Sequence, residues 1–289
     1  METTELIKKV RKIEIKTKGL SSQIFSGQYH SAFKGRGMAF SEVREYQYGD
    51  DIRSIDWNVT ARFNHPYVKI FDEERELTVM LLVDVSGSNQ FGAVGMIKEE
   101  MITEISAVLS FSAISNNDKV GVIFFSDKIE KFIPPKKGST HILRIIRELI
   151  NFKPESKGTD IGLVLKYLRD VIKKRSIAFL ISDLCGKDFH EPLSIVSRKH
   201  DLVGIRVYDQ RELELPPLGL MRFRDAETGK SFWIDTSSKG VQERIKEVNS
   251  EHEKYIKNSF SRANVDLVSI ATDGDYIRPM LNLFKKRSK

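Results

Sequence analysis

The sequence predicts an α/β protein: a doubly wound, mostly parallel sheet with one antiparallel edge strand and helices on both faces. Residues 77–85 and 176–181 are continuous apolar runs, which is typical of strands covered on both sides. Residues 141–151 place apolar side chains at helical spacing between such runs. Residues 120–125 and 129–133 are joined by a short polar turn, which predicts the antiparallel edge.

The rest of the chain fits this alternation of strands and helices. Helices are expected over residues 3–13, 93–115, 161–171, 188–199, 239–262 and 275–284, and strands over residues 67–71, 202–207 and 266–270. Asp160 is expected to cap the helix that follows it, because an aspartate side chain accepts hydrogen bonds from a first helical turn. Residues 14–40 and 134–140 are expected to be loops.

Two parts are expected: an N-terminal segment, residues 1–76, docked on a main domain, residues 77–289. An insertion at about 209–238 is expected to project from the main domain as a β-hairpin, with strands at 221–224 and 231–235. The N-terminal segment carries many opposed charges: Glu42, Arg44, Arg53, Asp56, Arg62, Lys69 and Glu73. We expect ion pairs among them to fix how the segment docks, with a catalytic use as the alternative.

Composition places the chain among globular proteins. Of its 289 residues, 40% are hydrophobic and 30% are charged, so disorder is not expected. No apolar run is long enough to span a bilayer, and the first residues lack the pattern of a secretory signal. The single cysteine, Cys185, excludes an internal disulfide, and we expect an idle thiol rather than a redox-sensitive one. These points favour the cytoplasm.

The chain is basic, and part of the excess charge lies at its ends. The formal net charge is +7, with basic clusters at residues 8–12 and 285–289. Basic ends can contact anionic lipid or nucleic acid, so peripheral membrane contact is allowed. No nucleic-acid-binding motif accompanies them, so we expect no specific nucleic-acid target, and solvated tails are the simpler interpretation.

The candidate site begins where the apolar strand of residues 77–85 ends. Asp84, Ser86 and Ser88 present one carboxylate and two hydroxyls at every second residue. Such spacing points the three side chains the same way along an extended chain. Hard cations such as Mg2+ prefer oxygen ligands of this kind. The pattern alone is a weak signal, because Asp and Ser also form ordinary turns after strands.

Two later stretches strengthen the prediction of a metal site. Thr159 lies just before a predicted helix, and Asp183 follows the apolar run of residues 176–181. The carboxyl ends of parallel strands share one edge of a sheet, and ligands of α/β folds bind there. We therefore expect Thr159 and Asp183 to meet the Asp84 motif at that edge.

This combination resembles the von Willebrand factor A fold, which is of the Rossmann type, and its metal-ion-dependent adhesion site. The family pattern is Asp-x-Ser-x-Ser, a Thr before a helix and an Asp after a later strand. The resemblance implies that Ser86, Ser88 and Thr159 ligate Mg2+, or else Mn2+ or Ca2+, while Asp84 and Asp183 act mostly through water or hydrogen bonds. It also implies an open coordination position for an acidic side chain of a protein partner. The alternative is a degenerate site whose oxygens only cap helices and turns.

The charged N-terminal segment is similar to the signature of a bacterial and archaeal family called domain of unknown function 58. The similarity rests on Gly35-Arg36-Gly37, Glu42-Val43-Arg44-Glu45-Tyr46, Gly49-Asp50-Asp51-Ile52-Arg53, Ile55-Asp56-Trp57 and Ala61-Arg62, followed by a von Willebrand factor A domain. It implies a MoxR-type AAA+ ATPase as partner, because members are typically encoded beside one, and a role in remodelling or assembling other proteins. Many members carry upstream membrane spans, whereas this chain resembles the short form without them.

The residues favour a metal-dependent binding module without catalytic residues, and two alternatives stay open. A metal-dependent hydrolase, such as a phosphatase, is suggested by an aspartate after a central strand. However, Ser86 stands where such an enzyme needs a second acid, and the six histidines lie in no recognisable motif. The other alternative is a basic surface that binds nucleic acid or lipid.

Overall fold

The chain divides into two compact units, which are described separately. The computed structural model describes residues 11, 13–14, 16–17, 39–72, 76–90, 97–186, 188–214, 216–225 and 229–287. The smaller unit spans residues 34–77, and the larger unit comprises residues 1–33 and 78–289. Docking of an N-terminal segment on the main domain stays a prediction. In the described residues, no helix combines the length and the apolar character needed to cross a membrane.

The larger unit is built on a six-stranded sheet with the strand order β10-β7-β6-β3-β4-β5. Its strands are β3 (Thr78–Asp84), β4 (Lys119–Phe125), β5 (Ile129–Lys136), β6 (Ile177–Ser182), β7 (Asp201–Tyr208) and β10 (Asp266–Ala271). All neighbouring strands run parallel except β4 and β5. This arrangement confirms the predicted doubly wound, mostly parallel α/β sheet with one antiparallel edge strand.

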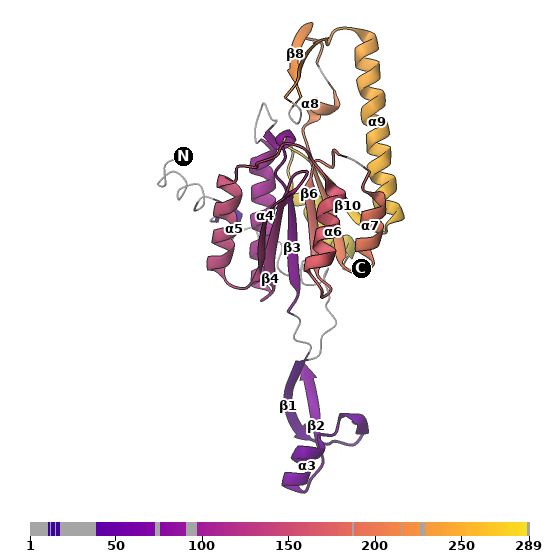
Figure 1. Ribbon diagram of the computed structural model, residues 1–289. Helices are drawn as coiled ribbons and strands as arrows, with labels where there is room; N and C mark the ends of the chain where they lie inside the picture. The colour runs from indigo at the N-terminus through magenta and orange to yellow at the C-terminus, as the bar shows by residue number, and fades with distance from the viewer. Residues whose placement is uncertain are drawn as a thin grey trace. The chain divides into compact units, whose positions relative to one another are not determined.

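Helices cover both faces of this sheet (Figure 1). They are α4 (Lys98–Ser115), α5 (Ser139–Asn151), α6 (Ile161–Val171), α7 (His190–Ser197), α9 (Lys239–Arg262) and α10 (Ile277–Arg287). Helix α4 packs beside α5, and α6 packs beside α7. Met80 and Leu82 of β3 share a buried apolar cluster with α6, α7 and the last turns of α9. The central strand is therefore covered as its apolar sequence requires.

Several predicted elements are present with shifted ends. The strand expected over residues 129–133 continues to Lys136, and α5 begins at Ser139, so the loop predicted over residues 134–140 was wrong except at residues 137–138. Two prolines are tolerated in β5 because it is an edge strand, where an amide hydrogen facing outward needs no partner. Residues 91–96 and most of residues 3–13 lie outside the described part of the chain.

An insertion follows β7 at the carboxyl edge of the sheet. It contains the short helix α8 (Gln210–Leu213) and a hairpin of β8 (Leu220–Arg224) and β9 (Ser231–Asp235), which pair in antiparallel register. The hairpin projects beyond the sheet beside the first turns of α9 (Figure 1). The predicted hairpin is confirmed, whereas α8 was not predicted.

The smaller unit contains a two-stranded antiparallel sheet and one short α-helix. Its elements are β1 (Ala39–Glu45), a 3-10 turn (Ile52–Ser54), α3 (Trp57–Phe63) and β2 (Tyr67–Asp72). Arg44 pairs with Asp50 at 2.7 Å and Lys69 pairs with Asp56 at 3.5 Å. Both of these ion pairs lie inside the unit. The predicted strand at residues 67–71 is present, whereas β1 and α3 were not predicted.

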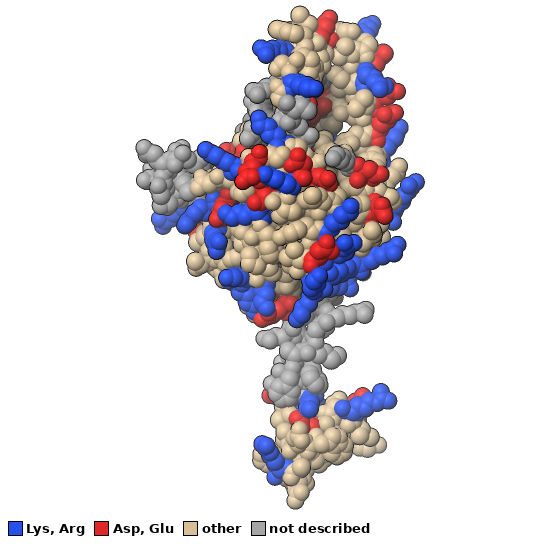
Figure 2. Space-filling view, in the orientation of Figure 1, with Lys and Arg blue, Asp and Glu red and all other residues tan. Residues whose placement is uncertain are grey.

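Charges of both signs cover the larger unit on the face shown in Figure 2. Acidic and basic side chains are interspersed over its upper half, which includes the carboxyl edge of the sheet, and basic side chains predominate at its lower end. Lys173, Lys174 and Arg175 are exposed between α6 and the amino end of β6. On this face, the basic side chains are therefore not concentrated at the carboxyl edge.

Helix α9 approaches the sheet over a glycine of β7. A Cβ atom at Gly204 would lie 2.2 Å from the Phe260 ring, so a side chain at this position would overlap it. Phe260 is fully buried, and its ring lies edge-on to that of Phe189 with 6.1 Å between centroids. The glycine is therefore required for α9 to pack against β7.

Replacing Gly204 with alanine is expected to destabilise the larger unit by about 1–3 kcal/mol, because the added methyl group would force Phe260 out of its packing position. Urea unfolding followed by circular dichroism measures the change. Gly240→Ala is the matched control, since no atom lies within 4 Å of a Cβ added there. Equal stability of Gly204→Ala and the wild type would contradict this packing.

His200 is a buried histidine just before β7. It is 1% exposed, and its Nδ1 atom lies 2.9 Å from Ser176 Oγ. Burial, together with the charges of Lys199 and Arg175, lowers the pKa of His200 to about 4. The folded protein therefore binds fewer protons at this position than the unfolded chain, whose histidine pKa is about 6.5.

The stabilising contribution of neutral His200 should be complete above pH 6.5 and be lost as the pH falls towards 4. His200→Gln is accordingly expected to cost the most stability near pH 7.5 and progressively less towards pH 4. Denaturant unfolding of both proteins across this range measures the difference. A difference that does not vary with pH would contradict the proposed burial of a neutral ring.

Candidate functional site

Three loops meet at the carboxyl edge of the sheet, around neighbouring strands β3 and β6. The chain leaves β3 towards β4 on one side and returns through β6 towards β7 on the other. This reversal of strand order opens a crevice where α/β folds commonly bind ligands. The first site loop comprises residues 84–88 after β3, the second comprises residues 157–160 before α6, and the third comprises residues 182–186 after β6.

The first site loop contacts both of the others. The backbone N–H of Gly87 donates to the carbonyl oxygen of Lys157 at 3.0 Å, which joins it to the second loop. The hydroxyl of Ser182 donates to Asp84 Oδ2 at 2.6 Å, which joins it to the third loop. The structure therefore brings the Asp84 motif beside the segments that carry Thr159 and Asp183.

The second and third site loops also touch each other. A Cβ atom added at Gly186 would lie 3.4 Å from the carbonyl oxygen of Thr159, so the two backbones are in close contact. Asp160 N donates to the carbonyl oxygen of Ser126, and Asp160 Oδ1 accepts from Leu163 N at 2.9 Å. The predicted helix cap is thereby confirmed, and it fixes the chain directly after Thr159.

Asp84 is almost fully buried, and hydrogen bonds hold both its side chain and its backbone in place. It is 1% exposed, its Oδ1 atom accepts from Ser86 N at 2.9 Å, and Asn89 Nδ2 donates to its backbone carbonyl. Burial, and then the nearby charge of Asp183, raise the pKa of Asp84 to about 7. Two neighbouring buried carboxylates are thus an unfavourable arrangement that a cation would relieve.

The hydroxyls of Ser86 and Ser88 are hydrogen-bonded to each other, at a separation that ligands of a small cation also adopt. Ser86 Oγ lies 3.0 Å from Ser88 Oγ. Adjacent ligands of an octahedral Mg2+ ion, bound at about 2.0–2.1 Å, are separated by about 2.9 Å. Among the described residues, no three His, Cys, Asp or Glu side chains form a metal cluster, so an ion here would depend on hydroxyl oxygens. The donor set fits a hard divalent cation.

The third site loop contains an unusual backbone conformation. Leu184 has a φ of 60°, in the left-handed region, which costs a non-glycine residue about 1–2 kcal/mol. Its side chain is fully buried in the apolar core, and its N–H donates to Ser182 Oγ at 3.0 Å. The preceding residue, Asp183, accepts from Cys185 N at 3.0 Å. The turn therefore sends Leu184 into the core and keeps Asp183 at the edge.

A buried lysine that sequence reasoning missed contacts Asp183. Lys98, the first residue of α4, is 1% exposed, and its Nζ atom lies 3.3 Å from Asp183 Oδ2 and 2.5 Å from Glu212 Oε1. Burial opposes the positive charge, but Asp183 and Glu212 outweigh it and raise the pKa of Lys98. The site therefore contains a protein cation of its own. The available signal was a lysine at a helix start, where the helix dipole disfavours positive charge.

Cys185 lies beside this group without the features of a reactive thiol. Its Sγ atom is 3.8 Å from His252 Nε2. Desolvation, followed by the charge of Asp183, raises the pKa of Cys185 to about 12. Cys185 is exposed, and its raised pKa disfavours the thiolate, which is the reactive form.

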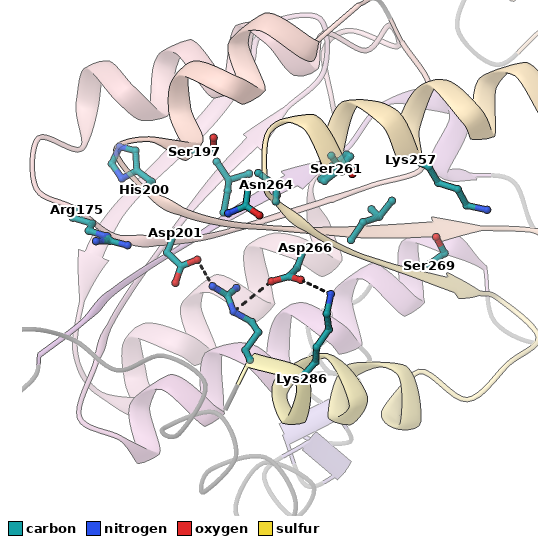
Figure 3. A pocket seen from close by; sticks show the side chains of 15 residues that line it. Arg175, Ser197, His200, Asp201, Lys257, Ser261, Asn264, Asp266, Ser269 and Lys286 are labelled. Carbon is teal, nitrogen blue, oxygen red and sulfur yellow. Dashed lines mark hydrogen bonds and ion pairs between the residues drawn. The ribbon is translucent and has the colours of Figure 1, made fainter. Parts of the chain in front are cut away.

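A cavity of about 650 Å3 lies at the opposite edge of the sheet, near the amino ends of β7 and β10 (Figure 3). Asp266 pairs with Lys286 at 3.2 Å and with Arg287 Nε at 3.6 Å, and Arg287 also pairs with Asp201. The carboxylates of this cavity are therefore neutralised by its own cations. None of the predicted site residues lines it.

Three bacterial proteins are similar to this chain in sequence. The chain is 26% identical over 294 residues to the uncharacterized proteins Mb1516 of Mycobacterium bovis and Rv1480 of Mycobacterium tuberculosis, covering 100% of this chain and 92% of each relative. It is also 26% identical over 131 residues to the uncharacterized protein YeaD of Bacillus subtilis, covering 45% of this chain and 29% of YeaD.

Two solved structures show a limited similarity to this chain. The conserved hypothetical protein BatB of Bacteroides thetaiotaomicron matches with a TM-score of 0.48 and 15% identity, over 73% of this chain and 98% of BatB. The VWA domain of SpRpn10 matches with a TM-score of 0.43 and 10% identity, over 73% of this chain and 95% of that domain.

A family model covers most of the chain. The model described as "Protein of unknown function DUF58" matches residues 42–255, from β1 in the smaller unit to the last turns of α9. The matched range includes all three site loops, Lys98 and the insertion. The protein therefore belongs to the DUF58 family.

Proposed function

We propose that this protein is a non-enzymatic, metal-dependent protein-binding module. Ser86, Ser88 and Thr159 would hold a divalent cation, Mg2+ or alternatively Mn2+ or Ca2+, with Asp84 and Asp183 beside them. When bound, the ion would supply positive charge and an open position for a carboxylate of a partner protein. The observation that carries the proposal is the pair of Ser86 and Ser88 hydroxyls, 3.0 Å apart, beside two buried carboxylates.

The protein's own residues prepare the site before any ligand arrives. Asp84 orients the first site loop through the N–H of Ser86, and Ser182 ties Asp84 to the third loop. All of these groups are buried, so they need little rearrangement to bind. Preorganised ligands of this kind reduce the ordering cost of binding.

A surface suited to a protein partner lies at the same edge as the site loops. The insertion starts from the carboxyl end of β7, which runs parallel to β6 and through it to β3. Its hairpin exposes Leu220 to 67%, Trp233 to 65% and Phe232 to 46%. Exposed apolar and aromatic side chains of this size are common at protein interfaces. A partner could thus combine apolar contacts on the hairpin with a carboxylate at the site.

The proposal includes a MoxR-type AAA+ ATPase as partner, an acidic side chain as the group it presents and the cytoplasm as the compartment. Its support is membership of DUF58, together with the exposed hairpin beside the site. Metal-dependent binding to such an ATPase would serve the assembly or remodelling of other proteins.

A hydrolase is supported less well by the same geometry. Asp84 is almost fully buried, and its two carboxylate oxygens accept hydrogen bonds from Ser86 N and Ser182 Oγ, so it is poorly accessible to a substrate. Ser86 supplies a hydroxyl where a second acid would be needed. We therefore expect no turnover of phosphate esters.

Manganese binding followed by electron paramagnetic resonance tests the site directly. The wild type is expected to bind one Mn2+ ion that Mg2+ displaces. The double variant Ser86→Ala/Ser88→Ala is expected to bind Mn2+ roughly tenfold or more weakly, because two direct ligands are lost. Ser115→Ala is the control, because the Ser115 hydroxyl donates within α4, to the carbonyl oxygen of Phe111. Absence of bound Mn2+ in the wild type would overturn metal dependence.

Capture of a co-encoded ATPase tests the partner. The wild type is expected to bind the ATPase in Mg2+, to lose binding in EDTA and to regain it when Mg2+ is added back. Asp84→Ala should bind poorly in Mg2+, because the first site loop loses its orienting carboxylate. Surface plasmon resonance measures each case. Equal binding by the wild type and Asp84→Ala, with or without EDTA, would exclude this route of recognition.

A further inference from the structure

We propose that Lys98 is a resident cation that competes with the metal ion for Asp183 and so couples metal binding to α8 and the insertion. The inference rests on the proposed metal site and names a residue that would regulate it. Lys98 is neither a predicted ligand nor part of the three site loops. Its position nevertheless links them to a separate element.

The link is made by one ammonium group and two carboxylates. Lys98 Nζ lies 3.3 Å from Asp183 Oδ2 in the third site loop and 2.5 Å from Glu212 Oε1 in α8. The lysine side chain is 1% exposed and that of Asp183 is 3% exposed, so water screens their attraction poorly. Glu212 is 31% exposed and is therefore the member that can move outward most easily.

Glu212 is attached to the base of the insertion. It forms a capping box with Asp209 at the start of α8. Asn249 of α9 donates to the carbonyl oxygens of Glu212 and Leu213, at 3.0 and 2.9 Å. A change in the contact between Lys98 and Glu212 would therefore alter how α8 is held and how it contacts α9, the helix that follows the hairpin.

Competition follows from the charges. A divalent ion among the site loops would neutralise Asp183 and repel the Lys98 ammonium, whereas the Lys98–Asp183 pair reduces the negative charge that attracts the ion. By linkage, each event weakens the other to the same extent. Metal binding should thus leave Lys98 with Glu212 as its remaining partner and tighten the anchoring of α8.

Two substitutions at the ends of one ion pair should shift metal affinity in opposite directions. Lys98→Met removes the competing charge and is expected to tighten Mn2+ binding about tenfold, whereas Glu212→Gln leaves the Lys98 charge less neutralised and is expected to weaken it severalfold. A purely structural role would weaken binding in both variants. Lys131→Met, which breaks the Lys131–Glu148 pair between β5 and α5, is the matched control.

Hydrogen exchange of peptides covering residues 209–214 provides a readout independent of affinity. Exchange in α8 is expected to slow when Mn2+ is added to the wild type and to be the same with and without Mn2+ in Lys98→Met. If Lys98→Met does not fold, Glu212→Gln carries the test, and an unchanged or raised Mn2+ affinity in it would overturn the proposal.

The failure of this inference differs from the failure of the proposed function. Equal Mn2+ affinities for the wild type, Lys98→Met and Glu212→Gln would overturn the coupling and leave the metal site in place. Absence of Mn2+ binding in all three proteins would overturn the metal site, and the coupling with it. Opposite shifts in the two variants, with a metal-dependent change in α8 of the wild type, support it.

Discussion

The site depends on the burial of two like charges at the point where the sheet reverses its strand order. Asp84 and Asp183 are 1% and 2% exposed and lie close enough for Asp183 to raise the pKa of Asp84. Buried carboxylates are unfavourable unless hydrogen bonds or cations compensate them. The structure supplies the Ser182 and Ser86 donors on Asp84 and the Lys98 ammonium on Asp183. The burial of the Lys98 ammonium beside Asp183 is a response to this concentration of negative charge.

The apolar scaffold makes that concentration tolerable. Residues 79–84 of β3 and all of β6 are buried, so the loops after them have little freedom to move their side chains towards water. Leu184 adds to this constraint, because its buried side chain holds the third loop in a left-handed turn that places Asp183 at the edge. The energy of core packing thereby maintains an arrangement that the polar groups alone would not adopt.

The sequence predicted the features that depend on local pattern. The apolar runs predicted β3 and β6, and Asp160 was predicted as a helix cap because capping requires only a residue type and its neighbours. Lys98 and Glu212 are separated by more than a hundred residues, and each looks like an ordinary surface charge in the sequence. Their pairing depends on how α4 and α8 approach the sheet edge, which no local pattern encodes. Strand β1 was missed for a similar reason, because its pairing with β2 crosses a long charged connection.

The position of Lys98 is informative because it is costly. A lysine at the first position of a helix opposes the helix dipole, and burial of its ammonium adds a desolvation penalty. Buried ion pairs are at best weakly stabilising, so stability is a poor explanation for this one. A cation that must be present at the site and also be displaceable is a better explanation, since a buried lysine on a flexible side chain can keep one carboxylate while it yields the other. Lys98, which helps the fold tolerate two buried aspartates, would then change its contact with the insertion when a metal ion neutralises those aspartates instead.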